Sequence, residues 1–238
     1  MTDAKRILML VSNPAVSPVT GWPIGFWWAE LSHAYEAFVE AGHAVTIASP
    51  KGGDVAADGW SDPEDASGYA AQDTISLAFK RDPAKAALLE GTPAIADLDP
   101  KDFDAVFVVG GQGPMVTMVD DREVQDLLAA FYEAGKVTAA VCHGTAVLLR
   151  TKLSTGDLLV KGHRWTGFAN SEEDYSEKAA GQRIQPFRIE DEARKLEGTE
   201  FVVAGPLEAF AIRDGLLVTG QQQVSSAAAA REVITALA

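Results

Sequence analysis

Short apolar runs alternate with amphipathic stretches along the first 150 residues of the chain. Apolar runs of this kind are typical of strands that are buried on both faces of a parallel sheet. Four of them predict strands, at 6–12, 43–48, 104–109 and 137–141. Two intervening stretches, 26–41 and 123–134, have the spacing of helices. Strand–helix–strand order favours right-handed crossovers, so we expect an α/β fold with a mostly parallel central sheet and helices on both faces.

The helix predicted at 26–41 has one apolar stripe and ends before Gly42. The stripe consists of Trp27, Leu31, Ala34, Tyr35 and Phe38. Glu30 borders this stripe, and a carboxyl group buried there would have a raised pKa and could act as a general base. A glutamate on the rim of the helix is the alternative.

Residues 50–100 differ in composition from the segments on either side. They are rich in Asp, Gly, Ala and Pro and contain one predicted helix near 83–89. Because they offer few large apolar residues for a separate core, we expect an excursion from the sheet. The whole chain, 1–238, is then a single domain.

The alternation of apolar runs and amphipathic stretches is less regular after residue 150. A short strand is predicted at 163–168, and a polar helix begins at Ser171, a candidate N-cap, followed by Glu172 and Glu173. A further helix is predicted at 189–196 and a closing helix at 225–238. Residues 210–219 alternate around Asp214-Gly215, which predicts a small β-hairpin near the C-terminus.

Composition and charge exclude some classes of function. The chain is 47% hydrophobic and 23% charged, as is usual for a globular protein. With 34 acidic and 20 basic residues its net charge is −14, which argues against nucleic acid and anionic membranes as partners. The chain lacks a run long enough to span a membrane and a signal-peptide core, and its one cysteine cannot form an internal disulfide. We therefore expect a cytoplasmic protein.

Cys142 has the strongest chemical signal in the sequence. The apolar strand 137–141 runs directly into it, and the segment Ala140-Val141-Cys142-His143-Gly144 places small residues around the sulfur. A sharp strand-to-helix turn requires such small neighbours, exposes the nucleophile and sets it at a helix N-terminus. Backbone N–H groups there should lower the pKa of the thiol below its usual value of about 8.5. A buried core cysteine is the alternative reading.

A second glycine-rich turn follows the strand 104–109. Its sequence, Gly110-Gly111-Gln112-Gly113, fits neither of the common nucleotide-binding fingerprints. It can offer backbone N–H groups to a small anion, or it can be a tight turn. The four histidines lack metal-ligand spacing, so we expect neither a metal nor a cofactor.

These residues resemble the ThiJ/PfpI superfamily of class I glutamine-amidotransferase-like proteins, in particular its heat-shock-chaperone-like glyoxalase III branch. The resemblance covers nearly the whole chain in order. It rests on five segments, 25–35, 109–113, 140–144, 166–173 and 217–221.

The resemblance implies a flavodoxin-like sandwich in which Glu30 is hydrogen-bonded to Cys142. His143 and Glu173, with Glu172 as the alternative acid, would complete a triad, and the N–H groups of Gly111 and His143 would form an oxyanion hole. A homodimer is also implied. Two positions depart from the family pattern: Gln112 stands where a histidine is frequent, and Thr145 where a proline is frequent. Gln112 can hydrogen-bond a carbonyl substrate but cannot titrate.

The leading hypothesis is a cofactor-independent glyoxalase III-like enzyme that converts methylglyoxal or a related 2-oxoaldehyde to a hydroxy acid. Cys142 would form a hemithioacetal, and Glu30 would move a proton between the two substrate carbons. Alternatives are a holdase chaperone, a protein deglycase, or a cysteine oxidation sensor. The aromatic residues Trp22, Phe26, Trp27 and Trp28 could be the client-binding surface of a chaperone or ordinary core residues. A cysteine amidohydrolase or peptidase is a further alternative.

Overall fold

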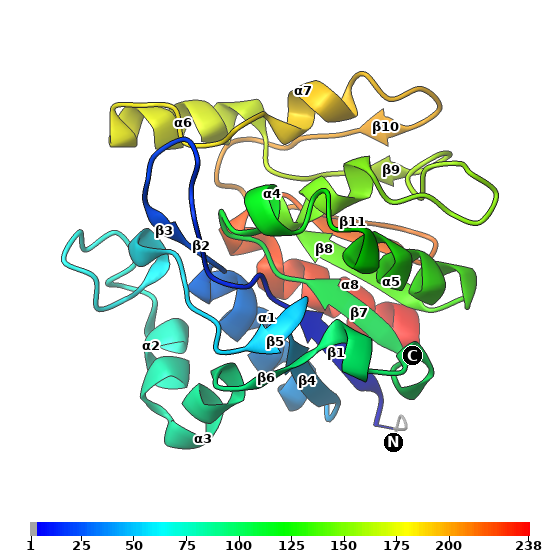
Figure 1. Cartoon of the computed structure of the whole chain (residues 1–238), viewed down its shortest axis with the longest axis horizontal. Coiled ribbons are helices and arrows are strands. Elements are labelled where there is room, and N and C mark those ends of the chain that lie inside the picture. The colour runs from blue at the N-terminus through cyan, green and yellow to red at the C-terminus, as the bar shows by residue number, and fades with distance from the viewer. Residues whose placement is uncertain (1–3) are drawn as a thin grey trace.

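The centre of the protein is a six-stranded sheet. We describe it from a computed structural model, which covers residues 4–238. The strand order is β11-β12-β8-β7-β1-β4 (Figure 1). Five strands are parallel: β1 (Arg6–Leu10), β4 (Ala44–Ala48), β7 (Ala105–Val108), β8 (Val137–Val141) and β12 (Leu217–Gly220). β11 (Ala211–Asp214) is antiparallel to β12 at one edge, so the predicted hairpin is correct and extends the central sheet.

Three long helices cover the sheet. α1 (Trp28–Glu40) and α8 (Ser226–Leu237) pack together on one face, and α5 (Arg122–Glu133) packs against β7 and β8 on the other (Figure 1). α5 begins where the Asp121 carboxylate accepts the N–H groups of Glu123 and Val124. The predicted sandwich with a mostly parallel sheet is therefore confirmed.

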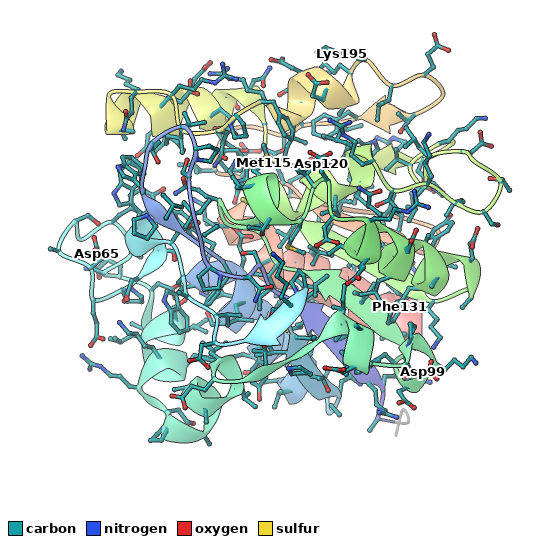
Figure 2. All side chains as sticks on the ribbon, in the orientation of Figure 1. Asp65, Asp99, Met115, Asp120, Phe131 and Lys195 are labelled. Carbon is teal, nitrogen blue, oxygen red and sulfur yellow. The ribbon has the colours of Figure 1, made fainter. Side chains whose placement is uncertain are left out.

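The core fills the space between the sheet and these helices because the strands carry apolar side chains on both faces. Every residue of β7 and β8 is buried, which accounts for their lack of polar alternation. Most charged side chains lie outside this core. Asp99 and Lys195 are at the periphery in Figure 2, whereas Phe131 of α5 is fully buried.

The excursion between β4 and β7 is more structured than its composition predicts. β5 (Lys51–Gly53) pairs with β6 (Thr92–Ala94), and α2 (Thr74–Arg81) lies between them in the chain. The sequence analysis missed α2, which Asp73 caps by accepting the Ser76 N–H. The predicted helix at 83–89 is present as α3 (Pro83–Ala86) followed by a 3₁₀ turn. Further 3₁₀ turns are at Gly59–Ser61, Ile95–Asp97 and Pro100–Asp102.

Smaller elements lie around the central sheet. β2 (Ala15–Val16) pairs with β3 (Pro23–Ile24), and β9 (Arg164–Trp165) pairs with β10 (Glu200–Phe201). α4 (Pro114–Thr117) follows the glycine-rich turn, and 3₁₀ helices cover Cys142–Leu149 and Gln223–Ser225. The short helices α6 (Asn170–Ala180) and α7 (Ile189–Ala193) lie together above the sheet (Figure 1).

Some predicted boundaries are wrong; the strand predicted at 163–168, for instance, is present only as β9 (Arg164–Trp165). α1 begins at Trp28 and not at residue 26, because the Phe26 N–H donates to the Ala56 carbonyl and holds the chain extended. As a result Trp28 packs in the core, while Trp27 is only half-buried. Ser171 is not an N-cap: α6 starts one residue before it. α7 ends at Ala193, short of the predicted residue 196.

Candidate active site

Cys142 lies on a sharp turn at the carboxyl end of β8. Its φ angle is +56°, a left-handed conformation that non-glycine residues rarely adopt and that costs roughly 1–3 kcal/mol. The preceding Val141 is still extended, and a 3₁₀ helix starts at Cys142 itself. A Cβ atom at Gly144 would lie 2.9 Å from the Val108 carbonyl oxygen, so the turn needs glycine there. This is the strand-to-helix elbow that the small-residue pattern predicts.

Glu30 reaches the elbow from the first turn of α1. Its side chain is completely buried, and its Oε2 accepts the Gly110 N–H at 2.8 Å. A Cβ atom at Gly110 would lie 2.4 Å from Oε2 and 2.9 Å from the Cys142 Cβ. The absence of a side chain at Gly110 therefore lets the carboxyl group and the cysteine come together. Among residues 4–238, Glu30 Oε1 has no hydrogen-bond partner that meets normal geometry.

Burial controls the ionisation of this pair. It raises the pKa of Glu30 from 4.5 to about 8, although the Cys142 thiol and the Gly110 N–H offset part of the rise. Burial also raises the pKa of Cys142 well above its ordinary value, and the neighbouring Glu30 raises it further. The predicted lowering of the cysteine pKa is therefore wrong. The His143 N–H does favour the thiolate, but desolvation and the adjacent carboxyl group outweigh it.

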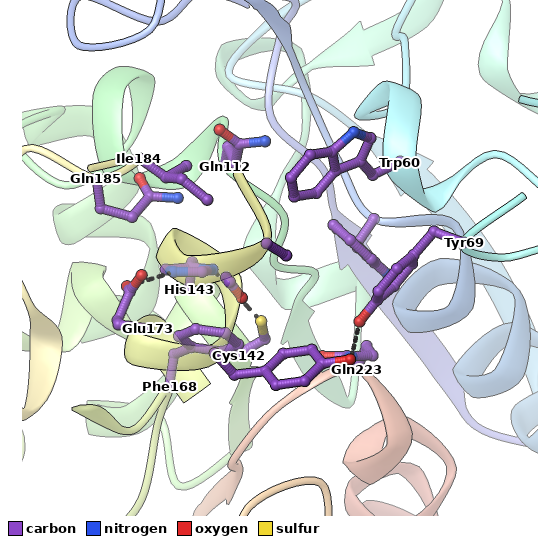
Figure 3. Close-up of a pocket in the computed structure, with 14 residues that line it drawn as sticks. Trp60, Tyr69, Gln112, Cys142, His143, Phe168, Glu173, Ile184, Gln185 and Gln223 are labelled. Carbon is purple, nitrogen blue, oxygen red and sulfur yellow. Dashed lines mark hydrogen bonds and ion pairs between the residues drawn. The ribbon is translucent and has the colours of Figure 1, made fainter. Parts of the chain in front are cut away.

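His143 connects the cysteine to a buried acid. Its Nδ1 lies 3.5 Å from Cys142 Sγ, and its Nε2 lies 2.9 Å from Glu173 Oε1 (Figure 3). The ring stacks on Phe168 at 4.0 Å between centroids, which fixes its orientation. Adjacent residues can make this contact because the left-handed turn at Cys142 brings the two side chains to the same side.

Glu172, the alternative acid, has a different position. Its carboxylate accepts the Ala169 N–H at 3.0 Å and the Gln221 Nε2–H at 2.9 Å, which ties the start of α6 to the segment after β12. Both glutamates are buried, but it is Glu173 that touches His143.

The glycine-rich turn forms one wall of the site. Gly111 has φ +101°, and a Cβ atom there would lie 2.6 Å from the backbone of Phe26 and Trp27. Among the described residues, the Gly111 N–H donates to no protein acceptor. The Gln112 side chain lines the pocket, and its Oε1 also lacks a partner within residues 4–238. The Gln112 side chain is thus available to a ligand.

Asp58 is a buried acid beside this turn that the sequence analysis missed. Its two oxygens accept the N–H groups of Gly25 at 2.9 Å and Gln112 at 2.6 Å. Burial raises its pKa from 3.8 to about 7. It lies in the Asp-rich excursion, where no local pattern distinguishes it from the exposed acids around it.

A pocket of about 50 Å³ opens over Cys142 and His143. Its walls are largely aromatic, and Figure 3 shows Trp60 and Tyr69 facing Phe168 across the opening. The aromatic members are Trp27, Trp60, Tyr69, Phe168 and Tyr175. Gln223 donates to the Tyr69 hydroxyl at 3.4 Å, which joins two segments of the rim that are distant in sequence. Such a pocket favours a small, partly apolar ligand.

Within residues 4–238, His, Cys, Asp and Glu side chains do not gather in groups of three that could hold a metal ion. Nor does any helix in that range have the length and apolar character needed to cross a membrane.

The fold and the site together define an α/β protein with a cysteine elbow at the carboxyl edge of a parallel sheet, next to a buried glutamate. The model of the DJ-1/PfpI family matches residues 25–236, and the chain belongs to this family. The ThiJ/PfpI resemblance seen in the sequence is thereby confirmed.

Its relatives include two named glyoxalases. Glyoxalase 3 of Candida albicans is 28% identical over 98% of this chain and 98% of its own length. Glutathione-independent glyoxalase HSP31 of Saccharomyces cerevisiae is 29% identical over 100% of this chain and 99% of its own. The crystal structure of glyoxalase III from Candida albicans superposes with a TM-score of 0.79 at 27% identity, covering 98% of this chain and 97% of that one.

Proposed function

We propose that this protein is a glutathione-independent glyoxalase that converts methylglyoxal, or a related 2-oxoaldehyde, to a hydroxy acid such as D-lactate. The observation that carries the proposal is the pairing of a buried glutamate with the cysteine: Gly110 holds the Glu30 carboxyl group beside Cys142, and one carboxyl oxygen has no hydrogen-bond partner among the described residues. The names of the two full-length relatives support the same reaction.

The reaction begins when the Cys142 sulfur adds to the aldehyde carbon. An S–C bond forms as the C=O π bond opens, and the thiol proton passes by way of His143 Nδ1 to the new hydroxyl oxygen. Glu173 holds the other ring nitrogen and orients the imidazole. The N–H groups of Gly111 and His143 stabilise the charge that develops on oxygen. The product is a hemithioacetal.

Glu30 then moves a proton between the two substrate carbons. Its carboxylate takes the proton from the former aldehyde carbon to give an enediol and returns it to the neighbouring keto carbon, while the hydroxyl proton of the hemithioacetal passes to the former keto oxygen. The first carbon is oxidised to a thioester carbonyl while the second is reduced to a carbinol, so no external oxidant or reductant is consumed. Water hydrolyses the thioester, releases the hydroxy acid and restores the thiol.

The alternatives have weaker support. The raised pKa of Cys142 disfavours an oxidation sensor, because sensor cysteines depend on a low pKa. Phe26 and Trp28 are core residues, which removes half of the aromatic surface suggested for a chaperone. A pocket of about 50 Å³ favours a three-carbon carbonyl compound over a peptide.

The direct test is turnover of methylglyoxal by the purified protein in buffer free of glutathione, with a stereospecific assay for lactate. We expect lactate from the wild type and none from Cys142→Ser. A wild type that converts neither methylglyoxal nor another 2-oxoaldehyde contradicts the proposal.

We further propose that the protein acts as a homodimer in the cytoplasm, as the family resemblance implies. Light scattering should then give about twice the chain mass of 25.2 kDa at micromolar concentration. A mass that stays near that of one chain as concentration rises contradicts the dimer.

A further inference from the structure

Two loops meet behind the pocket through their backbones. The Gly113 N–H donates to the Gly25 carbonyl at 2.8 Å, and the Trp27 N–H donates to the Gly110 carbonyl at 3.2 Å. Gly111 approaches the same loop so closely that it has no room for a Cβ atom. The loop that carries the Gly111 N–H and the Gln112 side chain therefore takes its position from residues 25–27.

Asp58 bonds to both loops at once. One carboxyl oxygen accepts the Gly25 N–H and the other accepts the Gln112 N–H. The side chain is completely buried, so water cannot replace either bond. Ser61 in turn fixes Asp58, because its N–H and hydroxyl both donate to the Asp58 carbonyl, at 3.0 Å and 2.7 Å.

The chemistry of this contact requires a carboxylate. Two backbone donors converge on one side chain, and only a carboxylate presents two acceptor oxygens in that geometry. An asparagine would keep one acceptor and turn its NH₂ group toward the second N–H. That N–H would then be buried without a partner, at a cost of roughly 1–3 kcal/mol. The loop can lower this cost only by moving.

We propose that Asp58 is a positioning residue for the glyoxalase reaction: it clamps the turn 110–113 to residues 25–27, so that the Gly111 N–H and the Gln112 carboxamide face the substrate oxygens. This inference rests on the proposed function. Asp58 acts through the loop, because both of its carboxyl oxygens already accept backbone N–H groups.

The test compares Asp58→Asn with wild type and with Asp65→Asn as a matched control. Asp65 is in the same excursion, lies at the outer edge of the molecule (Figure 2) and bonds to the Ser67 N–H, which an asparagine can still satisfy. Two activities are measured on each protein: kcat and KM for methylglyoxal, and the rate at which iodoacetamide alkylates Cys142. Alkylation develops no oxyanion, so it reports on the thiol and not on the loop.

For Asp58→Asn we expect kcat to fall by about a hundredfold, because displacement of one oxyanion donor by about 1 Å has an effect of this order. KM should change less, alkylation should stay within about threefold of wild type, and Asp65→Asn should match wild type in every assay. An unchanged kcat overturns the proposal. So does a parallel loss of kcat and alkylation, which would show a general collapse of the site.

Amide hydrogen exchange provides a readout that needs neither turnover nor the variant. If one carboxylate holds both loops, the Gly25 and Gln112 amides of the wild type should open together. Their protection factors should then lie within about threefold of each other. In Asp58→Asn, exchange at Gln112 should be at least about tenfold faster. Protection factors that differ by more than tenfold in the wild type overturn the clamp. If the wild type fails to convert any 2-oxoaldehyde, the proposed function is wrong, while exchange still decides whether Asp58 holds the loop.

Discussion

At the scale of single residues, the site depends on desolvation more than on the elbow itself. The turn at Cys142 does supply the His143 N–H to the sulfur, yet burial beside Glu30 raises the pKa of both groups. Before the reaction, a cysteine of this kind is a neutral thiol and not a thiolate. It loses its proton as it reacts, with His143 at 3.5 Å to receive it.

This ionisation predicts the pH dependence of turnover. Glu30 must be ionised to act as a base, and with a pKa of about 8 only about a tenth of it is ionised at pH 7. We therefore expect kcat/KM to rise roughly tenfold per pH unit between pH 6 and pH 7.5 and to level off above about 8. Steady-state kinetics across this range measure the profile. A profile that is flat from pH 6 to 8 means that another group is the base.

At the scale of elements, the local pattern of the chain predicted the parts that local forces determine. Apolar runs gave β1, β4, β7 and β8, and the turn at Asp214-Gly215 gave the hairpin. Elements held by distant contacts were missed or misplaced. The two-residue strand β10 is too short for a period to appear, and β9 covers only two residues of the strand predicted at 163–168. α1 starts late because the distant Ala56 carbonyl binds the Phe26 N–H.

The same distinction applies to the site. The elbow, Glu30 and the glycine-rich turn have local signals, and the choice between Glu173 and Glu172 came only from resemblance. Asp58 could not be found, because its two partners are 33 and 54 residues away in the chain. The sign of the Cys142 pKa shift was missed because a sequence shows a helix N-terminus but does not show how deeply the sulfur is buried.

The junction of β7 with its glycine-rich turn yields a prediction about packing. In Gly110→Ala the new methyl group would overlap Glu30 Oε2, the Val141 carbonyl and the Cys142 Cβ, at 2.4, 2.7 and 2.9 Å. Overpacking of this kind costs about 1–3 kcal/mol, and it must also separate the carboxyl group from the thiol. We expect turnover to fall at least about a hundredfold while the protein still folds. Urea unfolding and lactate assays measure the two effects.

Gly59→Ala is the matched control for this substitution. A Cβ atom there would have Asp65 Oδ2, at 3.9 Å, as its nearest neighbour, and the backbone does not have a positive φ. We expect activity and stability near those of wild type. If Gly110→Ala behaves like this control, the close packing at Gly110 has no catalytic consequence.

At the scale of the whole molecule, the buried carboxyl groups couple stability to pH. Folded Glu30 binds its proton more tightly than the unfolded chain does, since its pKa rises from 4.5 to about 8. Its contribution to stability is therefore complete below pH 4.5 and is lost as pH rises toward 8. The total is on the order of a few kcal/mol, a large part of the 5–15 kcal/mol typical of a domain. Asp58 likewise stabilises the fold at low pH, and its contribution is lost as pH rises from 3.8 to about 7.

The free energy of unfolding should show this coupling when wild type is compared with Glu30→Gln. The variant cannot ionise at position 30. Asp58 and the other charged groups titrate in the same way in both proteins. Wild type should therefore lose stability relative to Glu30→Gln between pH 5 and pH 8. Urea denaturation at several pH values measures the difference. If the difference is the same at pH 5 and pH 8, the pKa of Glu30 is not raised.

The central claim is that Glu30 moves the substrate proton, and turnover by Glu30→Gln tests it most directly. Glutamine has nearly the shape of glutamate, so the fold and the alkylation of Cys142 should be preserved. General base catalysis contributes on the order of 10²–10⁴-fold, so conversion of methylglyoxal to lactate should fall by at least about a hundredfold. Glu173→Gln should lose less, because it only orients His143. If Glu30→Gln keeps most of its activity while Cys142→Ser has none, the carboxyl group is structural and the proposed proton transfer is wrong.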